Sequence, residues 1–362
     1  MDIIALLLEG FAIAFQPINL VVVVIGVIVG LFIGAMPGLG SVNGVAILLP
    51  MTFLVPPTSA IIFLAALYYG AMYGGAISSI MLGIPGASTA VATTFDGRPL
   101  ALKGQADKAL ITAAMASFIG GTISVLLFTG FAPPLAQIAL DFGDHEIFAL
   151  MLLAFATFVG LSGDDIPKTI FSICIGLVFS AVGLDIMSGE PRLVFFDIIG
   201  FMHGINFLVL AIGIYGIGEM MWTIESNRGD STMSKAVLSI NGVFDSLREM
   251  RRTWFSWTTG SLLGFFVGIL PAAGATPGSL MAYGVAKMTS KESDNFGKGE
   301  IAGVVAPESA NNSASTGALL PMLTLGIPGS PTTAILLGGM VIWGLVPGPL
   351  LFVEEKEFVW GL

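Results

Sequence analysis

The chain has 362 residues, of which 55% are hydrophobic and only 10% are charged, and its formal net charge is −10. A soluble domain carries about 25% charged residues, so this composition, with a mean hydropathy of +0.92, excludes an ordinary soluble domain and indicates an integral membrane protein. The acidic balance and the scattering of the few basic residues in short loops argue against a nucleic-acid partner, and the single cysteine excludes an intrachain disulfide.

Long apolar segments follow one another along the chain. Crossing a hydrocarbon core of ~30 Å takes roughly 20 apolar residues, and the clearest candidates are residues 18–36, 109–132, 146–162, 169–187 and 205–223. The N-terminus lacks a basic segment and its apolar run continues past any cleavage point, so it does not resemble a signal peptide. The sequence therefore predicts an all-α, multi-pass helical bundle in a lipid bilayer.

Two kinds of Gly/Pro interruption recur, once in each half of the chain. Residues 30–40 read Gly-Leu-Phe-Ile-Gly-Ala-Met-Pro-Gly-Leu-Gly, and residues 264–274 read Gly-Phe-Phe-Val-Gly-Ile-Leu-Pro-Ala-Ala-Gly. The five letters Leu-Gly-Ile-Pro-Gly then occupy residues 82–86 and residues 325–329. The same two motifs in the same order indicate an internal duplication. Paired interruptions of apolar segments are typical of transporters, in which helices unwind beside the substrate.

The charged loops predict that the two repeats have opposite orientations. Loops rich in Lys and Arg stay in the cytoplasm, which places Arg98 and Arg251 inside and Asp141 outside. Loops that are basic in one repeat have counterparts without basic residues in the other, so we expect an inverted repeat. The resulting division is residues 1–140 for repeat 1, 141–252 for intervening spans and a cytoplasmic loop, and 253–362 for repeat 2.

The interruptions are the predicted substrate site. Pro removes an N–H donor and Gly tolerates open backbone dihedrals, so each interruption ends one half-helix and begins another, or forms a re-entrant tip. The free N–H groups and the partial positive charge at a half-helix N-terminus favour an anion. The candidate substrate-binding residues are Gly38, Gly40, Ser41, Asn43, Gly86, Ser88, Thr89, Gly274, Thr276, Gly329 and Thr332, together with the polar residues Asn311 and Asn312.

An alternative interpretation is that these small residues only let helices pack closely. The two interpretations differ in what they predict for Gly→Ala substitutions. If the interruptions bind substrate, Ala should impair uptake there, whereas Gly120 and Gly121, in an ordinary span, should tolerate Ala.

A second polar patch lies in the stretch Glu308-Ser-Ala-Asn-Asn312, between apolar segments. A carboxylate and two amides within a membrane are costly and point to a function. Their oxygen-rich character suits Na⁺ or a proton relay better than a transition metal, so one expectation is a Na⁺ site near Glu308, Asn311 and Asn312. The alternative is that residues 299–314 form a cytoplasmic loop in which Glu308 is solvated.

These motifs together match a known family. Pro37-Gly-Leu-Gly40, the Tyr/Gly run at residues 68–75, the two Leu-Gly-Ile-Pro-Gly motifs and the Glu308–Asn312 stretch resemble the large membrane subunit of the tripartite tricarboxylate transporters. The resemblance implies secondary active uptake of citrate-like di- or tricarboxylates across the bacterial inner membrane, without enzymatic activity or a cofactor and with Na⁺ or H⁺ as the coupling ion. It also implies two partners, a small four-helix membrane subunit and a periplasmic solute-binding protein. Members of the family are usually longer, so we expect that C-terminal spans are missing here.

Two other functions stay open at this point. Gly160-Leu-Ser162-Gly163 with His203 fits the pattern of an intramembrane serine protease, although the pattern is short and leaves the duplication unexplained. An ion channel would also use re-entrant segments. The sequence has no Gly-x-x-x-x-Gly-Lys-Ser/Thr motif, which argues against ATP drive within this chain.

Overall fold

The computed structural model describes residues 3–160, 166–184, 190–194, 198–205, 240–271 and 273–362, together with residues 210, 212–217, 221 and 225. Three of the described helices are long and apolar enough to cross a bilayer: α2 (Pro17–Ala35), α4 (Pro57–Leu82) and α6 (Ala106–Leu140). The helices α2 and α6 contain most of the predicted spans at residues 18–36 and 109–132. The prediction of an all-α membrane protein is therefore confirmed.

The first unit ends with the long helix α6. Its elements in order are α1 (Ile3–Ala14), α2, α3 (Gly40–Leu48), the 3-10 helix η1 (Leu49–Leu54), α4, the 3-10 helix η2 (Ser88–Ala90), α5 (Val91–Leu102) and α6. The helix α2 stops at the Pro37 interruption, because Pro cannot continue a helix from the preceding turn. The helix α4 stops at Gly83, which is left-handed with φ of 74°.

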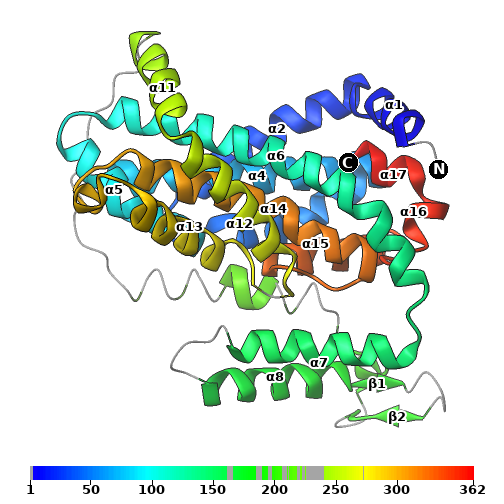
Figure 1. Cartoon of the computed structure of the whole chain (residues 1–362). Helices are drawn as coiled ribbons and strands as arrows, with labels where there is room; N and C mark the ends of the chain where they lie inside the picture. The colour runs from blue at the N-terminus through cyan, green and yellow to red at the C-terminus, as the bar shows by residue number, and fades with distance from the viewer. Residues whose placement is uncertain are drawn as a thin grey trace.

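The second unit shares part of the order of the first: a helix, an interruption, a second helix, a long helix and another interruption before a shorter helix. It contains α12 (Trp254–Ile269), α13 (Ala275–Thr289), η6 (Ser293–Asn295), α14 (Ala302–Leu325), α15 (Pro331–Ile342), α16 (Leu351–Glu354) and α17 (Lys356–Gly361). The helix α14 ends at Gly326, which is left-handed like Gly83 of the first unit. Figure 1 shows both chain ends at the same end of the molecule, beside α1 and α17.

Between the two units the chain forms a smaller layer. Its described elements are α7 (Asp144–Gly160), α8 (Ile166–Ser180), β1 (Gly183–Leu184), β2 (Pro191–Arg192) and η4 (Ile199–His203). The π-helix η5 (Ile212–Ile217) then lies against α3, and α11 (Ile240–Arg252) lies against α6. The helices α7 and α8 lie side by side below the main bundle in Figure 1. The predicted span at residues 169–187 is too long, because α8 ends at Ser180 and Gly183, with φ of 125°, begins the antiparallel pair β1–β2. The predicted span at residues 205–223 lies mostly outside the described residues.

Glycine stripes hold the central helix pairs together. In α2, a Cβ on Gly30 would lie 2.3 Å from the Leu67 carbonyl oxygen of α4, and in α12 a Cβ on Gly264 would lie 2.2 Å from the Ala310 carbonyl oxygen of α14. Such contacts bring helix backbones together without intervening side chains. Gly120 of α6 is equally close to α14, with the Ser309 oxygen 2.2 Å from an added Cβ. The expectation that Gly120 tolerates Ala is therefore wrong, because this glycine packs directly against a backbone.

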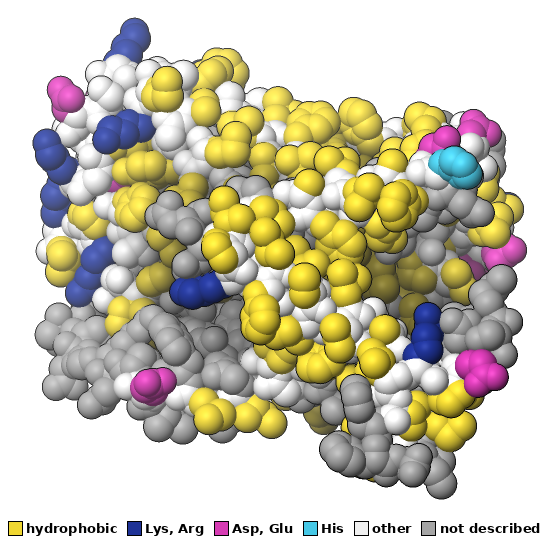
Figure 2. Space-filling model, turned by 90° about the horizontal axis from the view of Figure 1, so that it is seen from below, with side chains coloured by type: hydrophobic (Ala, Val, Ile, Leu, Met, Phe, Trp, Pro, Cys, Tyr) yellow, Lys and Arg dark blue, Asp and Glu magenta, His cyan; other side chains and the backbone are white. Residues whose placement is uncertain are grey.

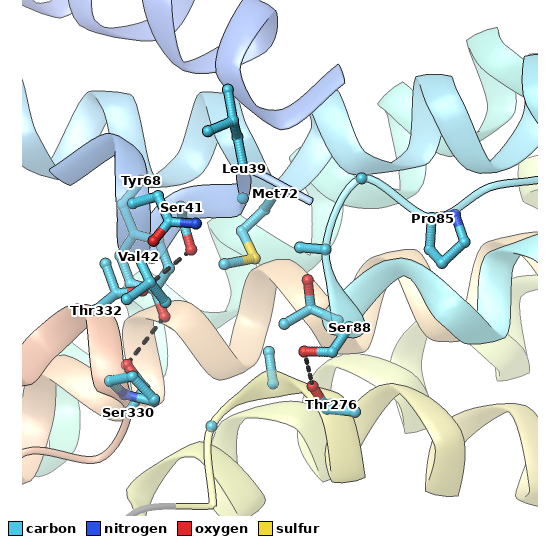
Figure 3. Close-up of a pocket in the computed structure, with 18 of the residues that line it drawn as sticks. Leu39, Ser41, Val42, Tyr68, Met72, Pro85, Ser88, Thr276, Ser330 and Thr332 are labelled. Carbon is cyan, nitrogen blue, oxygen red and sulfur yellow. Dashed lines mark hydrogen bonds between the residues drawn. The ribbon is translucent and has the colours of Figure 1, made fainter. Parts of the chain in front are cut away.

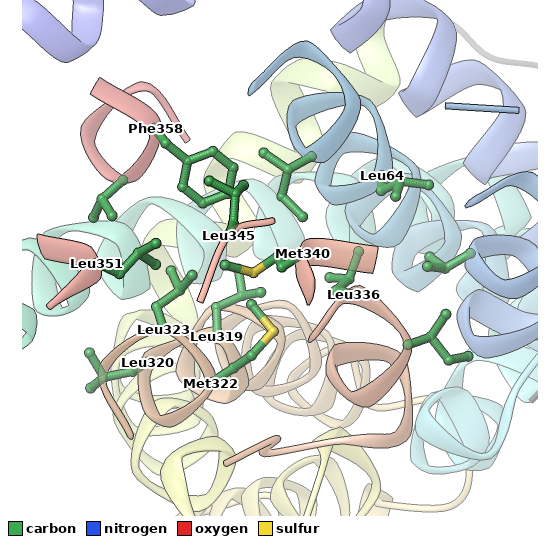
Figure 4. Packing of buried hydrophobic residues seen from close by; sticks show 14 of the residues in the cluster. Leu64, Leu319, Leu320, Met322, Leu323, Leu336, Met340, Leu345, Leu351 and Phe358 are labelled. Carbon is green, nitrogen blue, oxygen red and sulfur yellow. The ribbon is translucent and has the colours of Figure 1, made fainter. Parts of the chain in front are cut away.

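The counterpart helices α4 and α14 run in opposite directions. The last turn of α4 and the first turns of α14 share a hydrophobic cluster that includes Ile80, Ile301 and Val304. The first turns of α4 and the last turns of α14 share another cluster, which includes Leu64 and Leu323 and is drawn in Figure 4. Each end of the bundle therefore combines the start of one of these helices with the end of the other.

The charged side chains divide between the two ends of the bundle. Figure 2 shows Lys and Arg side chains gathered mainly at one end, where α5 and α11 lie in Figure 1. At that end Lys108 of α6 pairs with Glu249 of α11 at 2.6 Å, and Arg252 pairs with Glu249 and Glu300 at 2.8 Å each. Asp141 follows the opposite end of α6. This gathering of basic side chains (Figure 2) is compatible with the orientation expected from the loops, which stays a prediction.

Candidate functional site

Four interrupted segments, two from each unit, surround one cavity of about 530 Å³. The segments that line it are residues 38–43 and 85–89 of the first unit and residues 273–276 and 330–332 of the second. A helix begins at each of them: α3 at Gly40, η2 and then α5 from Ser88, α13 at Ala275 and α15 at Pro331. The cavity therefore lies where four helix N-termini converge, as Figure 3 shows.

The cavity lies near the middle of the membrane-spanning bundle. Tyr68 and Met72 of α4 line it. Figure 3 shows Met72 between the Ser41–Thr332 pair and the Ser88–Thr276 pair. At 1.5 Å per residue Tyr68 and Met72 are about 17 and 23 Å from the start of a helix about 39 Å long. A site at this depth is typical of transporters built from broken helices.

Equivalent backbone hydrogen bonds hold the interruptions in the two units. Gly38 donates its N–H to the Gly86 carbonyl oxygen at 3.1 Å, and Gly274 donates its N–H to the Gly329 carbonyl oxygen at 2.9 Å. Gly38 and Gly274 have φ of 90° and 63°, which L side chains rarely adopt. Since these two N–H groups already have acceptors, the donors left for a ligand are those of the first turns of α3 and α13, of Ser88 and Thr89 in η2, and of Thr332 in α15.

Hydroxyl groups join the two units across the cavity. Ser41 and Thr332 are hydrogen-bonded at 3.0 Å, and Ser88 and Thr276 at 3.1 Å. Tyr68 is hydrogen-bonded at 3.3 Å to Ser330. Each pair links a side chain of the first unit to one of the second, so a movement of one unit against the other would break or remake these contacts.

Ser330 also caps α15. Its hydroxyl accepts the N–H of Thr333, and the Thr333 hydroxyl accepts the N–H of Ser330. This reciprocal pair fixes where the helix begins. Thr332 is then the second residue of the helix, so its N–H belongs to the first turn and has no acceptor within the helix.

The electrostatics of the cavity come from the backbone. None of the described residues that line it carries a formal charge. Each helix N-terminus carries a partial positive charge of about half an elementary charge, and each exposes N–H groups without a helical acceptor. The Asn43 amide donates to the Gly38 carbonyl oxygen at 3.3 Å, whereas its Oδ1 atom is buried without a partner. The arrangement can bind an anion without a Lys or Arg side chain.

Most of the residues predicted from the sequence meet at this cavity. Those that line it are Gly38, Gly40, Ser41, Asn43, Gly86, Ser88, Thr89, Gly274, Thr276 and Thr332. Gly329 lies one residue before the lining, and a Cβ there would be 2.6 Å from the Gly268 carbonyl oxygen. Gly86 is packed as tightly, with the Gly34 carbonyl oxygen 1.9 Å from an added Cβ. At Gly86 and Gly329 the small residue thus serves close helix packing, which was the alternative interpretation.

Asn311 and Asn312 do not line this cavity. Asn312 faces a second, mainly apolar cavity between α2, α4 and α6 and donates its amide to the Glu308 carbonyl oxygen at 3.1 Å. Asn311 is fully buried in α14, and neither polar atom of its amide has a partner. The sequence candidates did not include Tyr68, Met72 and Ser330, although Tyr68 belongs to the Tyr/Gly run noted in the sequence.

Glu308 is buried in a helix and not solvated in a loop. The whole of α14, from Ala302 to Thr324, is buried, so the loop interpretation of residues 299–314 is wrong from Ala302 onward. Both carboxylate oxygens of Glu308 accept hydrogen bonds, from Thr93 of α5 and from Ser117 of α6. Among the described residues no group of three or more His, Cys, Asp and Glu side chains could hold a metal ion.

The residues of the protease alternative cannot be placed together. Gly160 ends α7 and His203 ends η4, but Ser162 and Gly163 lie outside the described residues. The protease pattern therefore stays an untested prediction.

A family model and one known protein match this chain over most of its length, and a second protein matches about a quarter of it. The family model described as "Tripartite tricarboxylate transporter TctA family" matches residues 20–362. A protein of Agrobacterium vitis described as "Uncharacterized 52.8 kDa protein in TAR-I ttuC' 3'region" is 37% identical over 362 residues, which is 100% of this chain and 71% of that protein. A second protein of Agrobacterium vitis, "Uncharacterized protein in TAR-II ttuC' 3'region", is 40% identical over 99 residues, which is 27% of this chain and 41% of that protein. No solved structure matches the chain.

Proposed function

Because the chain belongs to the tripartite tricarboxylate transporter TctA family, we propose that it binds a di- or tricarboxylate in the central cavity and carries it across the bacterial inner membrane. The observation that supports this most directly is the convergence of four helix N-termini on a cavity without charged side chains. Helix N-termini favour anions through their dipoles and their free N–H groups. A volume of about 530 Å³ is within the range of small-molecule sites.

Uptake of such an anion requires coupling to a cation gradient. Moving a negative charge inward against a negative-inside potential costs about 2.3 kcal/mol per charge per 100 mV. A tricarboxylate multiplies this cost, and the cavity itself supplies no compensating side-chain charge. We therefore propose symport with Na⁺ or H⁺.

We also propose that the two units form an inverted repeat that supports alternating access. The matching order of elements, the opposite directions of α4 and α14, and the paired Gly38–Gly86 and Gly274–Gly329 hydrogen bonds support this relation. Because the hydrogen bonds across the cavity join one unit to the other, rocking of the two units would open the site to either side.

The tripartite character of the family supports two further partners. We propose that a periplasmic solute-binding protein delivers the carboxylate and that a small four-helix membrane subunit completes the complex. The end of the bundle that carries Asp141 and the chain termini would then face the periplasm.

Uptake of [¹⁴C]citrate into right-side-out membrane vesicles tests the function, with inverted vesicles as the control. Succinate and an aromatic carboxylate serve as competitors. The complete transporter, with its partner proteins, is compared with Thr332→Val, which removes one hydroxyl from the cavity. Thr258→Val is the matched control, because the Thr258 hydroxyl bonds only to the Trp254 carbonyl oxygen of its own helix. We expect Thr332→Val to weaken uptake of the accepted carboxylate about tenfold, since a hydrogen bond to a charged group is worth about 1.5–3 kcal/mol. Absence of gradient-driven uptake of any carboxylate by the wild-type complex would rule out the proposed function.

A further inference from the structure

Glu308 carries a carboxyl group that the central cavity does not use. It has no exposed surface, and its two oxygens accept hydrogen bonds from Thr93 and, at 3.1 Å, from Ser117. Hydroxyl donors reduce the cost of burying a carboxylate, but they do not replace a counter-charge. The described side chains that interact with the carboxylate are these two neutral ones, and no Lys, Arg or His is among them.

The other titratable groups that the structure describes around Glu308 supply no positive charge either. Tyr73 of α4 faces it, and the Tyr73 hydroxyl donates to the Leu110 carbonyl oxygen at 3.1 Å. Asp96 of α5 lies one turn beyond Thr93, where it accepts the Tyr283 hydroxyl at 2.9 Å and two backbone N–H groups. A buried carboxylate in these surroundings needs one positive charge from outside the protein, either as a proton or as a monovalent metal ion.

Asn311 is a second, independent sign of a ligand beside Glu308. Its amide oxygen and nitrogen are both buried and both lack a partner. Unpaired buried polar groups are rare in native proteins, and where they occur a water or an ion is a common explanation. Glu308 and Asn311 are three residues apart in α14, so their side chains lie on one face of the helix.

The same face of α14 leads to the central cavity. Ser315 is one turn beyond Asn311 and lies against the Tyr68 hydroxyl, which lines the cavity. At 1.5 Å per residue the step from Glu308 to Ser315 is about 10 Å along the helix. Thr93 makes a second connection, because it follows the η2 turn whose Ser88 also lines the cavity.

We infer that Glu308 is the site that binds one monovalent cation, H⁺ or Na⁺, and that Asn311 and Ser315 connect this site to the central cavity. The inference deepens the proposed function, on which its link to transport rests, whereas cation binding at Glu308 requires no carboxylate. A cation there would hold α5 in place through Thr93, and with it the η2 segment that lines the cavity. Occupancy of the cation site would in this way favour binding of the anion.

The test measures the melting temperature of the purified complete transporter without any carboxylate. Samples contain NaCl or choline chloride at equal ionic strength, each at several pH values. A ligand that binds only the folded protein raises its stability with concentration. If Na⁺ is the ligand, NaCl raises the melting temperature of the wild type above that in choline chloride. If H⁺ is the ligand, the two salts give equal values, and the pH dependence of the wild type exceeds that of Glu308→Gln.

The substitution Glu308→Gln keeps the size of the side chain and should abolish whichever cation dependence the wild type shows. Glu9→Gln, at an exposed position of α1, is the matched control and should keep it. Thr93→Val serves if Glu308→Gln does not fold, and it should raise the half-saturating cation concentration about tenfold. Equal Na⁺ and pH dependence in the wild type and in Glu308→Gln would overturn the inference. Cation-dependent stability without any carboxylate uptake would remove the proposed function and leave the cation site.

Discussion

Replacing Gly274 with Ala isolates the cost of backbone conformation at one interruption. Gly274 precedes α13 with φ of 63°, and the nearest neighbour of an added Cβ is the Ser330 Cβ at 3.7 Å. There is room for the methyl group, so the penalty comes from the backbone conformation alone, with φ of 63° and ψ of −164°, a region that almost only Gly adopts and that costs other residues about 1–3 kcal/mol. That amount corresponds to a change of about 5- to 150-fold in a conformational equilibrium. We expect Gly274→Ala to fold and to lose uptake by a factor in this range.

Two other glycines provide the comparison. At Gly264 an added Cβ would lie 2.2 Å from the Ala310 carbonyl oxygen, so Ala there must push α12 away from α14. At Gly121 the nearest atom is the Tyr69 ring carbon Cε1 at 3.7 Å, and the backbone is helical. We therefore expect Gly264→Ala to lower the yield and the melting temperature, and Gly121→Ala to leave stability and uptake unchanged.

The assay has two stages, because strain at the site and loss of the fold must be separated. Size-exclusion profiles and melting temperatures of the purified variants come first, and initial rates of [¹⁴C]citrate uptake at equal amounts of protein follow. The reasoning fails if Gly274→Ala transports like the wild type. It also fails if Gly274→Ala lowers the melting temperature as much as Gly264→Ala does, since the structure gives it no clash.

Three further predictions concern topology, pH and the cavity. Cysteines placed at positions 98 and 141 should react with membrane-impermeant reagents from opposite sides, and labelling of both from the same side would contradict the charge-based orientation. Burial raises the pKa of Glu249, but the neighbouring Lys108 and Arg252 lower it by more, so its pKa lies below the ordinary value for a glutamate. Its ion pairs therefore stabilise the fold above that value and are lost as the pH falls below it, and the acid-induced drop in melting temperature should be smaller in Glu249→Gln than in the wild type. Tyr68→Phe should fold normally and reduce uptake several-fold, because it removes the hydroxyl that bonds Ser330 and lies against Ser315; unchanged uptake would show that these contacts do not matter for the site.

Local chemistry explains why the interruptions could be predicted from the sequence. Pro37 and Gly83 end helices whatever surrounds them, since the first cannot continue a helix and the second adopts a left-handed conformation. Repetition of these signals in both halves then indicates that the four segments belong to one site. The convergence of those segments on one cavity agrees with the pattern.

The face that each helix turns toward the cavity, which depends on its rotation about its own axis, could not be predicted in the same way. The helix α4 is apolar on all sides because it is buried on nearly all sides, so hydrophobic periodicity does not indicate which face lines the cavity. That face is set by the contact of Gly30 with the backbone of α4, which turns Tyr68 and Met72 toward the second unit. The position of Glu308 has a similar cause, because close packing of α12 and α6 on α14 at Gly264 and Gly120 leaves its carboxylate facing α5 and α6.

The two units also use one equivalent position for different chemistry. When the two Leu-Gly-Ile-Pro-Gly motifs are aligned, Tyr68 of α4 and Asn311 of α14 occupy equivalent positions in the sequence. Tyr68 completes the wall of the anion cavity through its bond to Ser330, whereas Asn311 lies unpaired beside Glu308. A cluster of N–H donors that attracts carboxylate oxygens repels a cation, so a transporter that moves both ions cannot bind them with the same groups. In the proposed mechanism, the difference between the two units at this position separates the two charges along α14, close enough for each to favour binding of the other.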